Sequence, residues 1–281
     1  MKAPTFVSLL ALGTMAATAN AALWVDFNSN QSGGGTPVAG DPTDTSTTNK
    51  NAAGYSSYHA RHETPGDFIT ATYNTTFANT GPASVGVTPS WSNTTDSNVQ
   101  QSIGRGAAND AQYTNPGDYS LELVTDWIGI DTRTGNGGNG NFDGAVGTPT
   151  WIDISLSSLP AGDYSWLSIH HDTENVFTNF NVYVDGVFAG TGFQSDSSTG
   201  GNPDSGALRT DGPASTFSTT FSADGSSDVV VRFEPLSGEL GNAVHNQLFA
   251  LNGFQLEQVP EPSVGLLGLL GAALLGLRRR R

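Results

Sequence analysis

The 281-residue chain contains no cysteine, and its 11 lysines and arginines are outnumbered by 26 aspartates and glutamates. The absence of cysteine excludes disulfide bonds, thiolate metal ligands and cysteine nucleophiles. The shortage of basic residues leaves a formal net charge of −15, and a surface of this sign repels nucleic-acid phosphates. We therefore expect no nucleic-acid partner, and a fold stabilised by buried apolar side chains.

Between its two ends the sequence also lacks an amphipathic helical pattern and an internal repeat of fixed period. It contains instead short, roughly alternating segments separated by Gly, Asn, Asp, Ser and Thr. The predicted strands are Leu23–Phe27, Asp67–Tyr73, Tyr119–Val124, Trp151–Leu156, Asp163–His170, Phe180–Asp185, Val187–Gly190, Phe217–Phe221, Asp228–Glu234 and Leu248–Leu256. About ten short strands with turns between them predict an all-β fold, a β-sandwich of jelly-roll type, over residues 22–258.

Two of these segments alternate cleanly enough to predict which side chains face the core. Ile154 and Val182 lie on the apolar sides of their strands, whereas Asp153 and Tyr183 lie on the opposite sides. The dipeptide Asp185-Gly186 between two strand-like segments is typical of a two-residue hairpin turn.

Three stretches contain almost no apolar residues and are rich in Gly, Ser, Thr, Asn and Asp. They are Asn28–Ser57, Gly135–Thr148 and Ser195–Pro213. A segment of this composition cannot bury enough apolar surface to order itself, so we expect long polar loops or insertions there.

The C-terminus contains three parts in a fixed order: Pro260-Glu261-Pro262, the uncharged apolar run Val264–Leu277, and Arg278–Arg281. The prolines keep the first part extended and accessible. A 14-residue helix spans roughly 21 Å, short of the ~30 Å hydrocarbon core of a bilayer, so it anchors a chain only weakly. Terminal arginines resist translocation and keep this end cytoplasmic.

This arrangement, at residues 259–281, resembles the PEP-CTERM sorting tail of bacterial proteins processed by exosortases. The resemblance implies a Gram-negative bacterium, export, anchoring in the inner membrane during sorting, and cleavage near Pro260, Glu261 and Pro262. It also implies delivery to the cell surface or to an extracellular polysaccharide matrix. The alternatives are an ordinary single-pass tail anchor and a helix of the protein core.

The N-terminus has the features of a secretory signal peptide. Lys2 supplies a positive start, Phe6–Ala17 is apolar, and Ala19-Asn20-Ala21 forms a small-residue cleavage site. We expect removal of residues 1–21, with cleavage after Ala19 as the second choice. The protein is therefore predicted to be exported.

A polar cluster, His170-His171-Asp172, lies where a predicted strand ends, and Trp151 and Trp166 lie on this strand and the one before it. Aromatic rings stack on the apolar faces of sugars, while Asp and His bond the hydroxyls, so this cluster is a candidate glycan site. A hydrogen-bonded turn with Trp166 in the core is the alternative, and metal binding is a third possibility.

Two other segments contain residue types that bind metals. Asn139, Asn141 and Asp143 place oxygen side chains at alternate positions, like the start of a calcium loop, although the bidentate acid that normally completes it is missing. His59 and His62 lack the spacing of a zinc protease motif. Calcium at the first segment therefore competes with a simple Asn/Gly loop, and no other cofactor is indicated.

The half of the chain from Trp151 to Glu257 is similar to the galactose-binding-like jelly rolls of carbohydrate-binding modules. The resemblance is one of strand pattern and implies a fold more than a ligand. No nucleophile elbow or phosphate-binding loop occurs in a suitable context. We expect a non-enzymatic surface or matrix protein with a structural or adhesive role and possible carbohydrate binding. The alternative is a polysaccharide-active hydrolase or lyase on the same scaffold.

Overall fold

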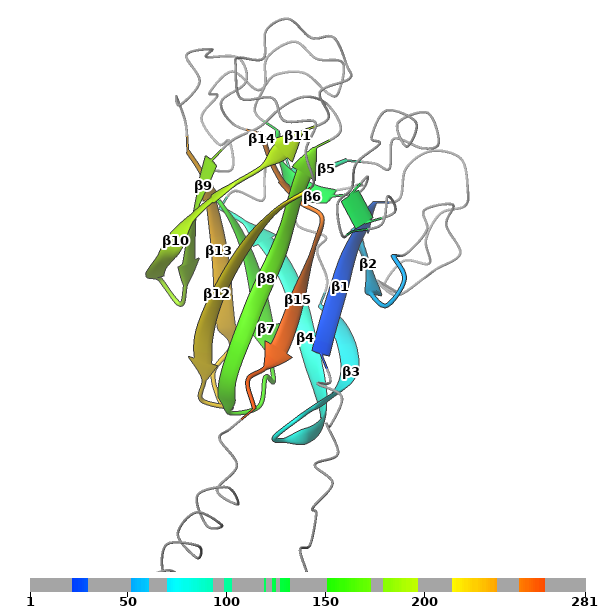
Figure 1. Ribbon diagram of the computed structural model, residues 1–281, viewed down its shortest axis with the longest axis vertical. Coiled ribbons are helices and arrows are strands. Elements are labelled where there is room, and N and C mark those ends of the chain that lie inside the picture. The colour runs from blue at the N-terminus through cyan, green and yellow to red at the C-terminus, as the bar shows by residue number, and fades with distance from the viewer. Residues whose placement is uncertain are drawn as a thin grey trace, which may run out of the picture.

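The computed structural model describes residues 22–29, 52–60, 70–92, 99–102, 119, 123–124, 127–131, 151–172, 179–196, 214–236 and 248–260. The described residues form fifteen strands in three sheets. Two six-stranded sheets lie face to face as a sandwich, and a small third sheet lies at one end (Figure 1). The predicted all-β sandwich is therefore confirmed.

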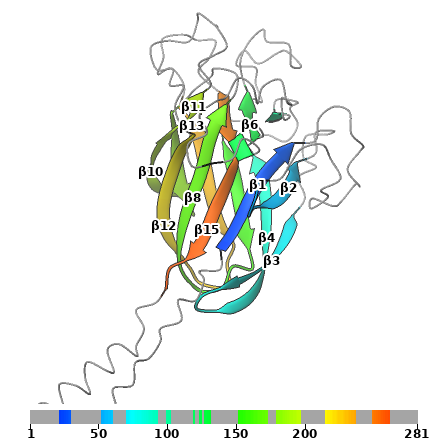
Figure 2. The same cartoon turned by 45° about the vertical axis from the view of Figure 1, so that its right-hand side comes forward.

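The front sheet has the strand order β11-β8-β15-β1-β2, with β12 paired to β8 on the same side as β11. Its strands are β1 (Ala22–Ser29), β2 (Ser56–Ala60), β8 (Gly162–Asp172), β11 (Ser195–Asp196), β12 (Ser215–Ala223) and β15 (Gly253–Gln258). Figure 2 shows β12, β8, β15 and β1 side by side across this sheet.

The back sheet has the order β10-β9-β13-β7-β4-β3, with every neighbouring pair antiparallel. Its strands are β3 (Ala71–Phe77), β4 (Gly81–Trp91), β7 (Ile152–Ser157), β9 (Asn179–Val184), β10 (Val187–Phe193) and β13 (Val229–Pro235). The small sheet joins β14 (Leu248–Leu251), β6 (Trp127–Asp131) and β5 (Val99–Ser102).

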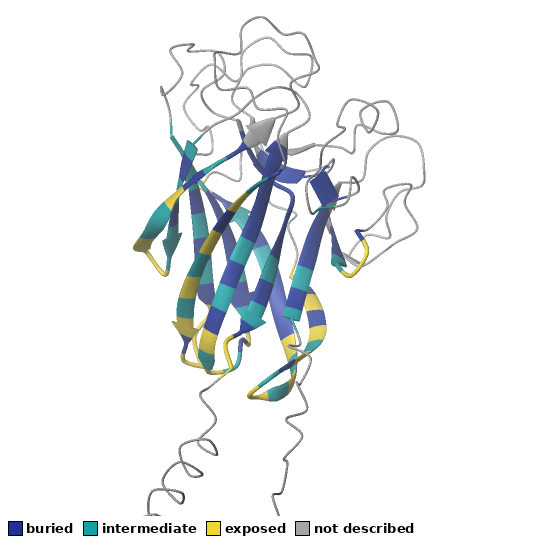
Figure 3. Ribbon diagram, viewed as in Figure 1, coloured by how far each residue is buried: buried dark blue, intermediate teal, exposed yellow. Residues whose placement is uncertain are grey.

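The core lies between the two large sheets and is built from alternate residues of each strand (Figure 3). Ile154 and Val182 are fully buried, as predicted from the alternation. Trp166 stacks on Phe254 with ring centroids 4.4 Å apart. Each fully buried aliphatic or aromatic side chain contributes roughly 1.5–3 kcal/mol, so burial is the main favourable contribution to the stability of this chain, which has no cysteine.

The residues predicted to face away from the core do so. Asp153 forms a bidentate ion pair with Arg232, at 2.7 Å to Nε and 2.9 Å to Nη2. The Arg232 guanidinium in turn covers the ring of Trp151, 3.8 Å from its centroid. Asp185 and Gly186 have φ values of 50° and 77°, which confirms the predicted hairpin turn between β9 and β10.

Several predicted strand boundaries were wrong. The segment predicted as one strand, Leu248–Leu256, is two strands that belong to different sheets, because the chain leaves the ladder at Asn252. Leu123 and Val124 lie outside the strands. The strand predicted over Asp67–Tyr73 runs instead over Ala71–Phe77, and residues 67–69 lie outside the described residues.

Other strands were missed in the sequence. β4 contains two prolines and two glycines and therefore has the composition of a loop. β2 begins at the end of the predicted loop Asn28–Ser57 and extends beyond it, and β11 lies at the start of the predicted loop Ser195–Pro213. Most of both loops, and all of Gly135–Thr148, lie outside the described residues.

One end of the sandwich contains the first residue of β1 and the last residue of β15. The two strands are antiparallel neighbours, with Ala22 opposite Glu257. Short turns join β3 to β4, β7 to β8, and β12 to β13 at the same end (Figure 1). Residues 1–21, predicted as a signal peptide, and the residues beyond Pro260 lie outside the described residues, and within the described residues no helix is long and apolar enough to cross a membrane.

Candidate functional site

The two histidines of the predicted glycan site lie inside the protein. His170 is completely buried, with Nδ1 2.9 Å from the Ala250 carbonyl and Nε2 2.7 Å from the Ser168 hydroxyl. Its ring lies 4.3 Å from the ring of Phe180. Burial lowers the pKa of His170 to about 3, so the imidazole is neutral and serves as a hydrogen-bonded part of the core.

His171 is also fully buried, and burial lowers its pKa to about 3. Its backbone N–H donates to Asn252 Oδ1 at 2.6 Å. Asp172 is the last residue of β8 and lies opposite Asp196 of β11. The prediction that His170 and His171 contact a ligand is therefore wrong, because no surface is available to them.

The two tryptophans of the predicted site have different positions. Trp166 is 1% exposed and faces the core, so it is not a surface stacking platform. Trp151 is partly exposed on the outer face of the back sheet, beneath Arg232. Strand β8 thus places Trp166 and His170 on its inner face, in the core. Trp151 lies on the outer face of the other sheet, so these residues do not form one site.

The predicted calcium residues Asn139, Asn141 and Asp143 lie outside the described residues, as does His62. His59 lies on β2. Within the described part of the chain, no group of three His, Asp or Glu residues is arranged to bind a metal ion. Calcium binding stays a prediction.

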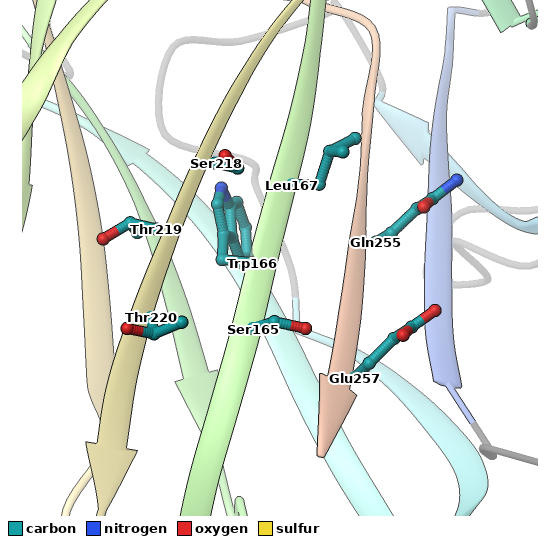
Figure 4. Close-up of a pocket in the computed structure, with 8 residues that line it drawn as sticks. All are labelled: Ser165, Trp166, Leu167, Ser218, Thr219, Thr220, Gln255 and Glu257. Atoms are coloured by element: carbon teal, nitrogen blue, oxygen red, sulfur yellow. The ribbon is translucent and has the colours of Figure 1, made fainter. Parts of the chain in front are cut away.

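The structure places a different candidate site on the outer face of the front sheet. A groove of about 560 Å³ crosses β12, β8 and β15 (Figure 4). We call it the front groove; its lining residues are Ser165, Trp166, Leu167, Ser218, Thr219, Thr220, Gln255 and Glu257.

The pairing of three antiparallel strands aligns these residues in rows. Leu167 lies opposite Ser218 on one side and Gln255 on the other. Two residues along, Ser165 lies in the same way between Thr220 and Glu257. Because side chains two residues apart share a face, both rows point away from the core.

An aromatic pair extends the first row. Trp24 of β1 lies opposite Gln255, and its ring centroid is 5.3 Å from that of Tyr55. Gln255 Nε2 donates to the Tyr55 hydroxyl oxygen at 2.5 Å. Burial raises the pKa of Tyr55 to about 12, outweighing the opposite effect of the hydrogen bond from Gln255, so the phenol is neutral.

The front groove is polar at its surface and apolar below. Ser218 and Gln255 flank Leu167, and Thr220 and Glu257 flank Ser165 in the next row, so hydroxyl, amide and carboxylate groups line the groove together with one apolar side chain. Beneath them lies Trp166, packed on Phe254. This arrangement offers donors, acceptors and an apolar contact to an uncharged, hydroxyl-rich ligand.

Sequence reasoning missed the front groove although its alternation is visible. Ser165 and Leu167 alternate with buried neighbours, and the exposed Ser218 and Thr220 alternate with less exposed ones. β8 ends at Asp172, β12 begins at Ser215 and β15 begins at Gly253, so the three strands are distant along the chain and only the cross-strand register brings their polar faces together.

Comparison with known proteins identifies the C-terminal tail. Residues 258–281 match the PEP-CTERM protein-sorting motif. This confirms the resemblance based on Pro260, Glu261 and Pro262, and it marks the chain as an exported protein that is sorted at the membrane. A search of the curated proteins found no match.

Three solved structures show remote likenesses to this chain. A family 35 carbohydrate-binding module from Clostridium thermocellum is 9% identical, with a TM-score of 0.30 over 68% of this chain and 99% of that one. A module of the same family from Cellvibrio japonicus is 12% identical, with a TM-score of 0.25 over 45% of this chain and 78% of that one.

An exo-beta-1,3-galactanase from Phanerochaete chrysosporium is 13% identical, with a TM-score of 0.28. That likeness covers 57% of this chain and 26% of the galactanase. TM-scores this low do not define a common fold.

Proposed function

We propose that this protein is a non-catalytic, jelly-roll surface or matrix protein that binds extracellular polysaccharide through the front groove. The matched sorting motif supports export and handling by an exosortase. Delivery to the cell surface or extracellular matrix is what the resemblance to PEP-CTERM sorting tails implies. In this proposal the signal peptide is removed and the apolar tail serves as a temporary membrane anchor.

The front groove is the observation on which this proposal depends. Polysaccharides present many hydroxyls, each both a donor and an acceptor, and the groove supplies hydroxyl, amide and carboxylate partners. Net hydrogen bonding to a hydrated sugar is weak, so binding also needs an apolar contact. Leu167 and the neighbouring Trp24 provide it.

The lining of the front groove also supports a non-catalytic role. Glycoside hydrolysis generally uses two carboxyl groups about 5 to 9.5 Å apart. Among the described residues that line the groove, Glu257 is the one carboxylate. A binding function needs no second acid.

The test is binding of the purified protein to immobilised polysaccharides and a glycan array, with and without calcium. We expect Trp24→Ala to weaken binding about tenfold, which corresponds to about 1.4 kcal/mol. The matched control is Trp151→Ala, a partly exposed tryptophan on the opposite face of the sandwich, which should bind normally. Native circular dichroism spectra should accompany both variants.

Loss of binding in Trp151→Ala but not in Trp24→Ala would move the site to the back sheet and contradict this proposal. Release of reducing ends that disappears in Glu257→Gln would instead identify a polysaccharide-active enzyme. A calcium-dependent signal unaffected by either tryptophan would place the ligand at the predicted calcium loop.

A further inference from the structure

The chain is held by hydrogen bonds immediately before the sorting motif. Gln258, the last residue of β15, is 1% exposed, and its Oε1 accepts the backbone N–H of Asn79 at 2.9 Å. Asn79 Nδ2 donates to the carbonyl of Val259 at 2.9 Å. We call Asn79 and Gln258 the exit clamp, since together they fix the point where the chain leaves the sandwich.

The other side of β15 is fixed as well. The N–H of Val259 donates to the Asp163 carbonyl at 2.8 Å, which extends the β8–β15 ladder by one residue. Gln258 Nε2 donates to the Tyr164 hydroxyl at 3.4 Å. Gly162 leaves the space for this amide, because a Cβ there would lie 2.6 Å from Gln258 Nε2. Both backbone polar groups of Val259 are therefore paired.

Exposure changes abruptly at this point. Gln258 is buried, Val259 is 39% exposed, and Pro260 is exposed. Pro260 has no N–H and cannot continue the ladder. The sandwich and the Pro-Glu-Pro motif are thus adjacent in the chain, with no linker between them.

A protease needs several residues of extended backbone with their hydrogen-bonding groups free. β15 is paired on both edges, to β8 and to β1, so its peptide bonds are inaccessible while the sheet is intact. We propose that the exit clamp sets the upstream limit of processing. The sorting enzyme then acts on the folded sandwich, at a peptide bond beyond Val259, and leaves β15 whole.

In the hydrolytic form of this step, the C–N bond of one peptide beyond Val259 breaks. The carbonyl carbon gains the hydroxyl of a water molecule, and the nitrogen of the released tail gains the proton. The domain then ends in a carboxylate.

The inference rests on the proposed sorting role, and intact-mass analysis of the surface form in an exosortase-containing host tests both. The expected product begins at Ala22 and ends at Val259 or a later residue before the apolar run. Retention of Arg278–Arg281 would overturn sorting and this inference with it. A product ending upstream of Val259 would overturn the exit clamp alone.

The sharper test uses Asn79→Ala, which removes the bond to the Val259 carbonyl and keeps Gln258 in place. One lost hydrogen bond should raise local opening on the order of 2- to 10-fold, measured as faster exchange of the Val259 amide. Products shorter than Val259 should increase by a similar factor. The matched control is Asn74→Ala on the same hairpin, where the exposed side chain accepts from Ser84 instead.

The control should show neither change. If Asn79→Ala accelerates exchange at Val259 and still yields only the wild-type C-terminus, the exit clamp does not limit processing. An equal increase of shortened products in Asn74→Ala would also overturn the proposal, because it would show that any weakening of the β3–β4 hairpin has this effect.

Discussion

His170 and His171 show how a polar residue at the end of a predicted strand can be misassigned. Their sequence neighbours Asp172, Thr173 and Glu174 are polar, which favours a surface site. The structure buries both imidazoles. The His170 ring is hydrogen-bonded to the Ala250 carbonyl and the Ser168 hydroxyl, and the backbone N–H of His171 donates to Asn252, so two of these three partners are distant in the sequence. No local pattern contains that information.

The burial of these histidines predicts a pH dependence of stability. The folded-state pKa values lie at about 3, below the ordinary value of 6.5, so the unfolded state binds more protons between these limits. Stability is therefore complete above about pH 6.5 and falls as the pH decreases toward 3. Each histidine contributes a slope of about 1.4 kcal/mol per pH unit within that window.

Urea unfolding at several pH values between 5 and 7 measures this slope. His171→Gln should remove about half of it, because one of the two buried imidazoles is gone. An unchanged slope in that variant would contradict the assignment to the histidines.

Ile154 provides a second residue-scale prediction. Its side chain is fully buried at the centre of β7, so Ile154→Asp places a charge in the core without a partner. We expect destabilisation of several kcal/mol, about 4 or more. Ser155→Asp, the next residue and half-buried on the outer face, should cost about 1 kcal/mol or less. Thermal melts compare the two, and equal melting temperatures would refute the register.

At the scale of elements, the boundary between β14 and β15 depends on Asn252. Its Oδ1 accepts from the His171 N–H at 2.6 Å, and its Nδ2 donates to the Val124 carbonyl at 3.2 Å. Its own N–H donates to the Ile169 carbonyl at 3.0 Å. A buried asparagine with these partners lets the chain change sheets without leaving polar groups unpaired.

Asn252→Ala should therefore destabilise the protein by about 1–3 kcal/mol, because it leaves the His171 N–H and the Val124 carbonyl without this partner. Asn181→Ala is the matched control, since its side chain accepts one bond from the exposed hydroxyl of Thr191. The difference in urea midpoint between the two variants is the measurement. A midpoint for Asn252→Ala equal to that of the control would show that the strand break does not depend on this side chain.

Strands could be predicted from the sequence where apolar and polar side chains alternate. The prediction failed where proline and glycine gave a strand the composition of a loop. β4 was missed because of Pro82 and Pro89. Pro82 pairs with β3 at a point that β7 does not reach, and Pro89 pairs with β7 beyond the end of the β3 ladder. Each proline thus has one unpaired edge, where its missing N–H costs nothing.

At the scale of the whole molecule, the sequence predicts the class of fold and the sorting tail, and it does not predict the binding surface. The tail is a contiguous motif, so its residues are visible together. The front groove combines β8, β12 and β15, and its rows exist only after these strands are paired. Strand pairing also places Trp24 beside Gln255 and buries Trp166, so Trp24 replaces Trp166 as the candidate sugar contact.

The position of the exit at the end of β15 also determines how the molecule responds to force. A protein held by its C-terminus and pulled through a ligand in the front groove is loaded along its strands. β15 then shears against β1, with five paired positions, and against β8, with six. In shear these hydrogen bonds share the load and fail together, whereas peeling would break them one at a time. In the proposed role as a surface or matrix protein, this geometry would favour resistance to tension along the strands.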